Sequence, residues 1–245
     1  MPRLRRYELT DLPQHVVQRG NNRQPTFFAD ADYVFYLECL RDAAKRYGCE
    51  IHAYVLMTNH IHLLVTPRKP LAIAKLLQSV GRRYVRYINY EYRRSGTLWE
   101  GRYKASLVNT QEYFLSCSRY IETNPVRADM VVDPRDYPWS SYRSNAWGEP
   151  STLLTPHSEY TNLGSSEEER CRTYRELFRA DLEASALQEI RDSVNQSRPL
   201  GSKRFQEQIE ETLKRRLQPG KPGPKKKGKG DNTESTQEMQ RQLLL

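Results

Sequence analysis

Over the first 125 residues, hydrophobic and polar positions repeat with two different periods, one typical of strands and one typical of helices. Short runs rich in β-branched and aromatic residues predict strands at 15–18, 50–57, 60–66 and 103–108. Apolar residues three and four apart predict helices at 31–47, 72–93 and 111–123. Asp30 is expected to cap the first helix, and Gly48 to end it. Its buried stripe is predicted to be Val34, Leu37, Leu40, Ala44 and Tyr47.

The order of these elements is β-α-β-β-α-β-α. It predicts an α+β fold, a ferredoxin-like βαββαβ sandwich with an antiparallel sheet and one extra helix. Beyond Pro150 the pattern becomes purely helical, with stripes at 171–182, 187–194 and 205–217 and a capping signal at 165–169. We therefore expect an α/β domain over 1–150, a small helical region over 151–217 and a basic, disordered tail over 218–245.

Composition narrows the class of protein. The chain has 245 residues, a net charge of +9 and a mean hydropathy of -0.84. No run approaches the roughly 18 apolar residues of a membrane-spanning helix, and no apolar stretch follows the basic start as in a secretory signal. The four separated cysteines are typical of reduced thiols. These features predict a cytoplasmic, nucleoid-associated protein without a membrane partner.

The positive charge is concentrated in two blocks. Residues 1–150 hold 22 basic and 15 acidic side chains, and residues 201–245 hold 11 and 6. In the first block, arginines between 82 and 102 and Lys104 alternate with tyrosines and Trp99. Cations suit phosphates and flat rings suit unstacked bases, so this block favours nucleic-acid binding. The alternative is a solvated helix face whose tyrosines pack on the core.

His60 and His62 are the first candidate for chemistry. Side chains alternate along a strand, so both imidazoles project from one face while Ile61 faces the other. Such a pair can bind one cation if a third ligand comes from elsewhere, although an isolated His-X-His is usually only exposed on a sheet. The apolar flanks predict a buried strand, where an unsatisfied polar pair would be costly.

Tyr120 and Asn124 form the second candidate. They are four residues apart, so they lie on one face of the last helix, and a hydroxyl and an amide oxygen would share one pocket. Taken alone, the pair is better explained by a core tyrosine and an asparagine that caps the end of the helix.

With these residues the chain resembles the single-tyrosine HUH transposases, and most closely their REP-associated tyrosine transposase branch. The resemblance covers about residues 10–148. It rests on five motifs in family order: Gln18–Arg23, Val55–His62, Leu98–Lys104, Arg119–Ala128 and Pro138–Arg143. Glu122 and Thr123 are less typical of the family.

The resemblance implies a catalytic domain over 1–150 that cleaves and rejoins single-stranded or hairpin DNA, REP elements included. Tyr120 would be the nucleophile, giving a 5′-phosphotyrosine. His60, His62 and Asn124 would bind a divalent ion, Mg²⁺ or Mn²⁺. DNA contacts are expected from Arg19, Asn21, Arg23, Arg82, Arg83, Arg86, Trp99, Arg102, Lys104 and Arg127. Tyr84, Tyr87 and Trp99 are the expected base-stacking residues.

Two alternative functions and the oligomeric state stay open on the sequence. The chain would be a domesticated, non-catalytic binder of palindromic hairpins if the chemistry were lost. An HUH replication initiator or relaxase is disfavoured because those chains are usually longer, and no G-x-x-x-x-G-K-[ST] phosphate loop is present. The sequence does not decide between a monomer and a homodimer.

Overall fold

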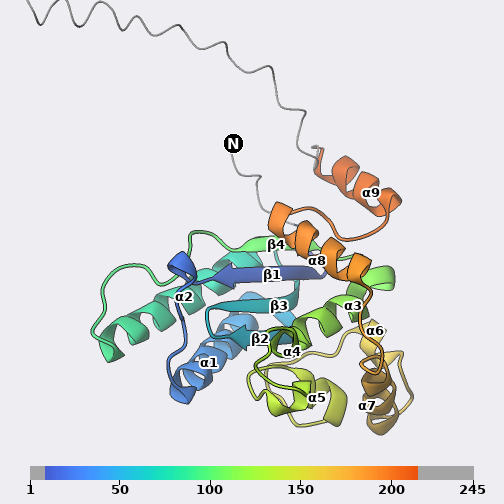
Figure 1. Cartoon of the computed structure of the whole chain (residues 1–245). Helices are drawn as coiled ribbons and strands as arrows, with labels where there is room; N and C mark the ends of the chain where they lie inside the picture. The colour runs from blue at the N-terminus through green and yellow to red at the C-terminus, as the bar shows by residue number, and fades with distance from the viewer. Residues whose placement is uncertain (1–8, 215–245) are drawn as a thin grey trace, which may run out of the picture. The chain divides into compact units, whose positions relative to one another are not determined.

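The computed structural model describes residues 9–214 (Figure 1). Four strands form one antiparallel sheet: β1 (Gln14–Arg19), β2 (Cys49–Met57), β3 (His60–Pro67) and β4 (Lys104–Leu107). Their spatial order is β2-β3-β1-β4, with β1 and β3 in the centre. This topology confirms the predicted ferredoxin-like α+β fold. The predicted tail at 218–245 lies outside the described residues.

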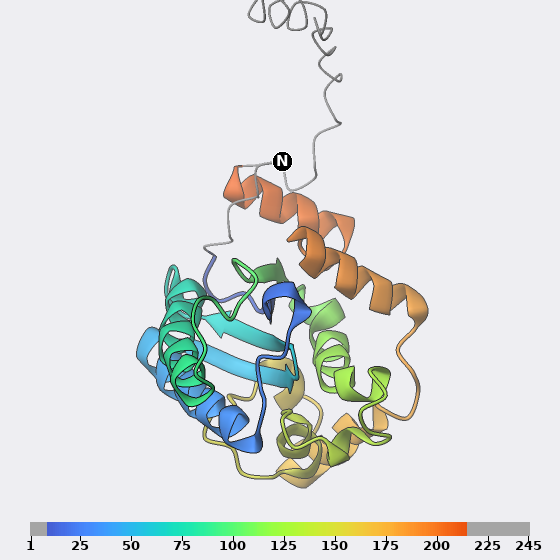
Figure 2. The ribbon, with the colours of Figure 1, turned by 60° about the vertical axis from the view of Figure 1, so that its left-hand side comes forward.

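Helices cover both faces of the sheet (Figure 2). α1 (Asp30–Tyr47) and α2 (Ala72–Glu91) pack on one face, and α3 (Thr110–Glu122) packs on the other. Strand alternation decides which side chains each face receives: Ile61 and Leu63 of β3 enter the α1–α2 core, whereas Leu64 meets α3. His60 and His62 therefore face α3.

The start of α1 differs from the sequence prediction. Asp32, not Asp30, satisfies the free backbone groups there, accepting from the N–H groups of Phe28 (2.8 Å) and Ala29 (3.0 Å). The buried stripe is also shifted, because Val34 is 48% exposed while Tyr33 and Tyr36 enter the core. Tyrosines bury more surface than valine, so their packing sets the rotation of the helix.

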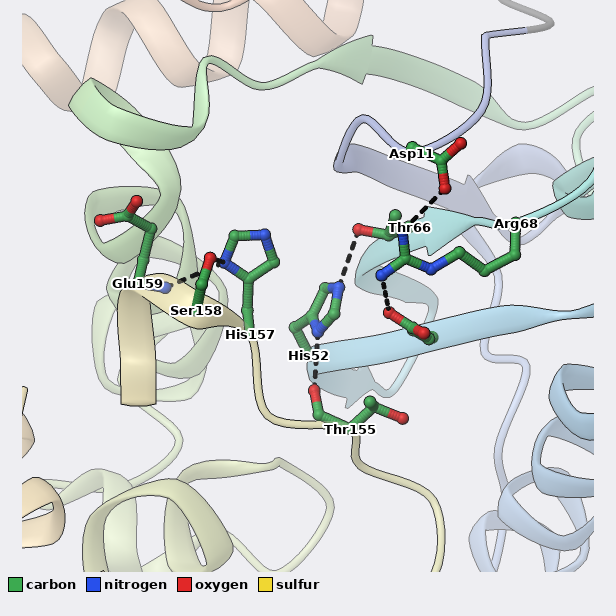
Figure 3. Close-up of polar contacts among 9 residues, drawn as sticks. Asp11, His52, Thr66, Arg68, Thr155, His157, Ser158 and Glu159 are labelled. Atoms are coloured by element: carbon green, nitrogen blue, oxygen red, sulfur yellow. Dashed lines mark hydrogen bonds and ion pairs between the residues drawn. The ribbon is translucent and has the colours of Figure 1, made fainter. Parts of the chain in front are cut away.

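Irregular segments cover the exposed edge of β2. Trp139 accepts from the Leu56 N–H, Ser141 donates its N–H to Tyr54, and Thr155 donates to Ile51. His52 fixes the last of these segments, since its Nδ1–H donates to the Thr155 carbonyl (2.7 Å) and its Nε2 accepts from the Thr66 hydroxyl (2.8 Å), as Figure 3 shows. These pairings block edge-to-edge association of the sheet.

The C-terminal half of the described chain is helical. It comprises α5 (Tyr142–Trp147), α6 (Ser158–Thr161), α7 (Glu167–Glu176), α8 (Ala184–Gln196) and α9 (Lys203–Leu213), with the short turns η1 (Asn21–Arg23) and η2 (Pro134–Asp136) earlier in the chain. Ser166 caps α7 as the sequence predicts. The stripe expected to run through Phe178 and Leu182 instead leaves the helix after Glu176. The boundary expected at residue 150 stays a prediction.

Glu122 ties these helices to α3. It is fully buried and accepts hydrogen bonds from Ser141 (2.5 Å), Asn145 (2.8 Å) and Tyr174 (2.8 Å). Burial raises its pKa to about 7, although these three hydrogen bonds oppose the shift. The residue that looked atypical in the motif is thus the junction of α3 with α5 and α7.

Two predicted absences can be compared with the structure. All four cysteines are buried and free, which confirms that they form no disulfide. Within residues 9–214, no helix has the length and apolar character needed to cross a membrane.

Candidate active site

The histidine pair lies at the start of β3, next to a two-residue turn. The imidazole centroids of His60 and His62 are 5.0 Å apart, and both rings face α3. The turn, Thr58–Asn59, joins β2 to β3, so the pair occupies the position where the central hairpin reverses. The structure thus brings the two histidines together as the strand pattern predicts.

Both imidazoles are held in the neutral form. Burial, with help from Arg19, lowers the pKa of His60 to about 4. Burial also lowers the pKa of His62 well below its ordinary value, and the neighbouring His15, His60 and Arg127 act in the same direction. Neutral imidazoles have a free lone pair, which is the state required of a metal ligand.

A third histidine, His15 of β1, belongs to the same cluster. It is fully buried, its Nε2 lies 2.8 Å from Nδ1 of His62, and the two rings stack at 5.1 Å. Its own Nδ1 is buried without a hydrogen-bond partner in the described structure. The sequence analysis placed His15 in a strand but gave it no role, because its contact with His62 depends on the pairing of β1 with β3. The one sign of such a role in the sequence was a histidine beside Val16 in an otherwise apolar strand.

Tyr120 lies above this cluster on the last turn of α3. Its ring centroid is 5.9 Å from that of His62 and 5.7 Å from that of His15, with both pairs edge to face. The tyrosine is 5% exposed, so only a small part of it faces solvent. The structure therefore places the predicted nucleophile beside the predicted metal ligands.

Asn124 begins a separate short helix, α4 (Asn124–Arg127), after Thr123 interrupts α3. Its Nδ2 donates to the carbonyls of Tyr120 (3.0 Å) and Ile121 (3.1 Å). The amide nitrogen is thus committed to the backbone, and the amide oxygen is directed away from these carbonyls. α3 thus ends at Glu122, within one residue of the predicted end, and Pro125 is tolerated in the first turn of the new helix that follows.

Arg127 is the cation in contact with Tyr120. Its guanidinium carbon lies 4.3 Å from the centre of the Tyr120 ring, and it donates to the Tyr120 carbonyl (2.7 Å) and to the Thr123 hydroxyl. Burial lowers the pKa of Arg127, and proximity to Tyr120 opposes that shift. A guanidinium in this position is suited to stabilise negative charge that develops beside the tyrosine.

Asn59 connects the histidine pair to the loop that follows β1. Its Oδ1 accepts from Nδ1 of His60 (2.6 Å), and its Nδ2 donates to the Arg23 carbonyl (2.9 Å). The Nε2 lone pair of His60 is thereby left available. No role is predicted for Asn59 from the sequence, although an amide can bridge two groups in this way.

Apart from Arg127, which lies beside Tyr120, the predicted DNA-contacting residues fall into two groups. Gly20 and Asn21 bond to the 98–99 segment, which brings the Gln18–Arg23 and Leu98–Lys104 motifs side by side. Arg19, Arg23 and Arg102 are exposed there, and Lys104 is exposed with its Nζ on Asn195. Gly20 is required at this crossing, since a Cβ would lie 2.3 Å from the Gln24 carbonyl oxygen.

The second group is on α2. Arg82 and Arg86 are exposed, whereas Arg83 pairs with Asp42 (3.0 Å). Two of the expected stacking residues are contradicted by burial: Tyr84 is 0% and Trp99 6% exposed, and both pack in the α1–α2 core. Tyr87 is half-buried and donates to Asp32.

The types of donor atom at this site fit a divalent ion. Two neutral imidazoles and an amide oxygen are ligands that Mn²⁺ accepts, and Mg²⁺ to a lesser extent. Among residues 9–214, no group of three His, Cys, Asp or Glu side chains is placed to hold a metal ion. A third protein ligand would therefore have to be of another type, as the amide of Asn124 is.

Part of the chain is similar to a known protein family. Residues 8–124 match the model of the IS200-like transposase family. The matched segment contains β1 to β4, both histidines of the pair, Tyr120 and Asn124.

Two solved structures are similar. One is a REP-associated tyrosine transposase bound to a REP hairpin, with a TM-score of 0.53 and 17% identity, covering 64% of this chain and 93% of that one. The other is a putative transposase from Deinococcus radiodurans R1, with a TM-score of 0.35 and 23% identity, covering 50% and 97%. The first supports the fold. No curated protein sequence matches the chain.

Proposed function

We propose that this protein is a transposase of the REP-associated branch, which cuts and rejoins single-stranded or hairpin DNA through a covalent bond to Tyr120. The observation that carries the proposal is the position of Tyr120 beside the His60–His62 pair. The ring centroids of Tyr120 and His62 are 5.9 Å apart, and all three residues lie in the segment that matches the family model. The structurally similar REP-associated protein is described as bound to a REP hairpin, which supports the same substrate class here.

The chemistry is an exchange of esters. The Tyr120 oxygen attacks the phosphorus, the bond from phosphorus to O3′ breaks, the phenolic proton passes to solvent and the departing O3′ takes up a proton. The products are a 5′-phosphotyrosine and a free 3′-hydroxyl. Rejoining is the reverse attack by a 3′-hydroxyl, so no ATP is required.

Each residue of the site has a task in this scheme. Tyr120 is the nucleophile, and a phenol is a weak nucleophile that needs a polarised target. Arg127 holds the Tyr120 ring and stabilises charge on the phosphate. His60, His62 and Asn124 would hold Mg²⁺ or Mn²⁺, which when bound polarises a non-bridging phosphate oxygen. Because Tyr120 is nearly buried, a phosphate within an intact duplex would not reach it without distortion, which favours single strands and hairpins.

The test is incubation of the full chain with a panel of hairpin oligonucleotides and Mg²⁺ or Mn²⁺. We expect a covalent protein–DNA species from wild type, none from Tyr120→Phe, and an unchanged yield from the matched control Tyr90→Phe, whose side chain is 83% exposed. Tight hairpin binding without cleavage under either ion would instead indicate a non-catalytic hairpin binder.

A further inference from the structure

A cavity of about 690 Å³ is lined in part by Arg127 but not by Tyr120. One wall comes from the end of α3 and from α4, with Arg119 and Arg127. The facing wall comes from α7 and the segment after it, with Arg175, Phe178 and Arg179. None of the histidine pair, Tyr120 or Asn124 lines it, so it is distinct from the site described above. Its size falls in the roughly 300–1,000 Å³ range of sites that bind small organic groups.

Positive charge dominates the lining. Four arginines face two aspartates, Asp133 and Asp181, and among the described residues only Arg179 of the four is ion-paired, with Glu176 (2.7 Å). Arg119 and Arg175 are held by backbone carbonyls, those of Ala180 and Ala146, rather than by carboxylates. Their charges are therefore positioned without being neutralised, which suits a phosphate.

Of these arginines, Arg119 has a buried N–H group that lacks a hydrogen-bond partner in the described structure. This group is at Nε, and burial lowers the pKa of the Arg119 guanidinium. A buried donor without a partner is costly, so a small movement of the Arg119 side chain that brings this N–H to an acceptor on a ligand would be favoured. Beside it, Phe178 offers an aromatic ring 5.8 Å from the Arg119 guanidinium carbon, and Tyr142 and Leu187 extend the apolar lining. Cations next to a flat apolar surface match a nucleotide, which has both a phosphate and a planar base.

Arg127 connects this cavity to the nucleophile. It lines the cavity and at the same time contacts the Tyr120 ring at 4.3 Å. A strand whose phosphate lies at Tyr120 would therefore have its next nucleotide within reach of the cavity.

We propose that this arginine-lined cavity binds one unpaired nucleotide of the substrate strand, adjacent to the phosphodiester that Tyr120 attacks. The phosphate lies among Arg119, Arg127 and Arg175, and the base lies against Phe178. Most of the lining follows residue 124, where the family match ends, so the C-terminal helices complete the substrate site. The proposal rests on the proposed function, since it takes the DNA strand at Tyr120 as given.

The first test is photocrosslinking of the full-length Tyr120→Phe protein, which cannot cut. Single-stranded oligonucleotides carrying one 5-iododeoxyuridine are irradiated and the modified peptides are sequenced by mass spectrometry. We expect a crosslink to Phe178 or Tyr142. Crosslinks that map only to other aromatic residues would overturn the proposal, and the test leaves every residue of the cavity unsubstituted.

The second test is a binding cycle by fluorescence anisotropy. A hairpin with a single-stranded arm is compared with the same hairpin carrying an abasic site at each arm position in turn. Stacking of one base is worth about 1–3 kcal/mol, so we expect one abasic position to weaken binding by about 5- to 150-fold. In the double variant Phe178→Leu, Arg179→Ala that position should lose its effect, whereas Arg172→Ala, an exposed control on α7, should keep it. An equal effect in the double variant and the control would contradict the proposal.

Free nucleotide is the other source of the same chemistry. Deoxynucleoside monophosphates added at millimolar concentration should compete only weakly with the arm. Saturable binding of the monophosphate that leaves arm binding unchanged would overturn the strand assignment and indicate an effector site. Both tests measure binding, so their results are informative even if Tyr120 forms no adduct with DNA. Conversely, if the protein cleaves DNA but the double variant at Phe178 and Arg179 keeps the abasic effect, only the proposal about the cavity is refuted.

Discussion

Replacing His15 with leucine should weaken Mn²⁺ binding by the protein about 10- to 100-fold. In the structure, His15 Nε2 lies 2.8 Å from His62 Nδ1. For His62 to bind an ion through Nε2, its proton must be on Nδ1, and His15 is the group that can accept a hydrogen bond from it. Leucine has a similar volume but no acceptor, so the tautomer and ring orientation of His62 are no longer fixed.

The expected effect on stability is small. In the metal-binding tautomer, the Nδ1–H of His15 is buried without a partner. His15→Leu removes that orphan and creates another on His62, each worth about 1–3 kcal/mol. The two changes oppose each other, so the free energy of unfolding should change by less than the loss of metal affinity would suggest.

The assay is isothermal titration of Mn²⁺ into the DNA-free protein, with urea unfolding as the control. His15→Gln, which restores an acceptor near the Nε2 position, should recover most of the affinity. Unchanged Mn²⁺ affinity in His15→Leu would refute the role of His15, and equal weakening by leucine and glutamine would show that packing matters and the acceptor does not. A second readout needs no metal: nitrogen chemical shifts of His62 should report a proton on Nδ1 in wild type and a tautomer mixture in His15→Leu.

Three further predictions concern stability and DNA affinity. Burial lowers the pKa of His52 to about 4, so the folded state resists protonation of this side chain. Urea unfolding should therefore show up to about 3 kcal/mol of stability lost as the pH falls from about 6.5 to 4. The variant His52→Asn keeps a donor but does not titrate, so it should lack this part of the loss. Glu122→Ala leaves three buried donors without their acceptor and should cost about 3–5 kcal/mol, seen as a lower urea midpoint; a loss below 1 kcal/mol would show that the junction with α5 and α7 is not structural. Arg82→Ala and Arg86→Ala should each weaken hairpin binding irrespective of sequence and reduce the salt slope by about 1, so an unchanged slope would exclude phosphate contacts there.

The sequence predicted the fold because its evidence is local. Alternation along 50–57 and 60–66 determines which side chains face together, and a two-residue turn leaves a hairpin as the only connection. The prediction that His60 and His62 share a face needed nothing more. Residues Tyr120 and Asn124 were recognised through family motifs, and their roles stay predictions.

The parts that sequence reasoning missed depend on contacts between distant segments. His15 meets His62 only through the register of β1 on β3, 47 residues apart, which no local pattern encodes. Trp99 was expected to stack on bases because it follows a basic, aromatic run, but its indole is buried with Tyr36 and Tyr84 of the helices beneath it. Glu122 looked like a neutral departure from the motif, because its partners lie on segments far along the chain.

Mapping the covalent linkage tests the central claim most directly. A hairpin oligonucleotide labelled separately at its 5′ and 3′ ends is cut by the full chain with Mn²⁺, and the protein-bound peptide is sequenced by mass spectrometry. We predict that the fragment 3′ of the cut stays attached, through its 5′ phosphate, to the peptide containing Tyr120, while the other fragment ends in a free 3′-hydroxyl. Attachment to any other residue, attachment through a 3′ phosphate, or an adduct that persists in Tyr120→Phe would contradict the account.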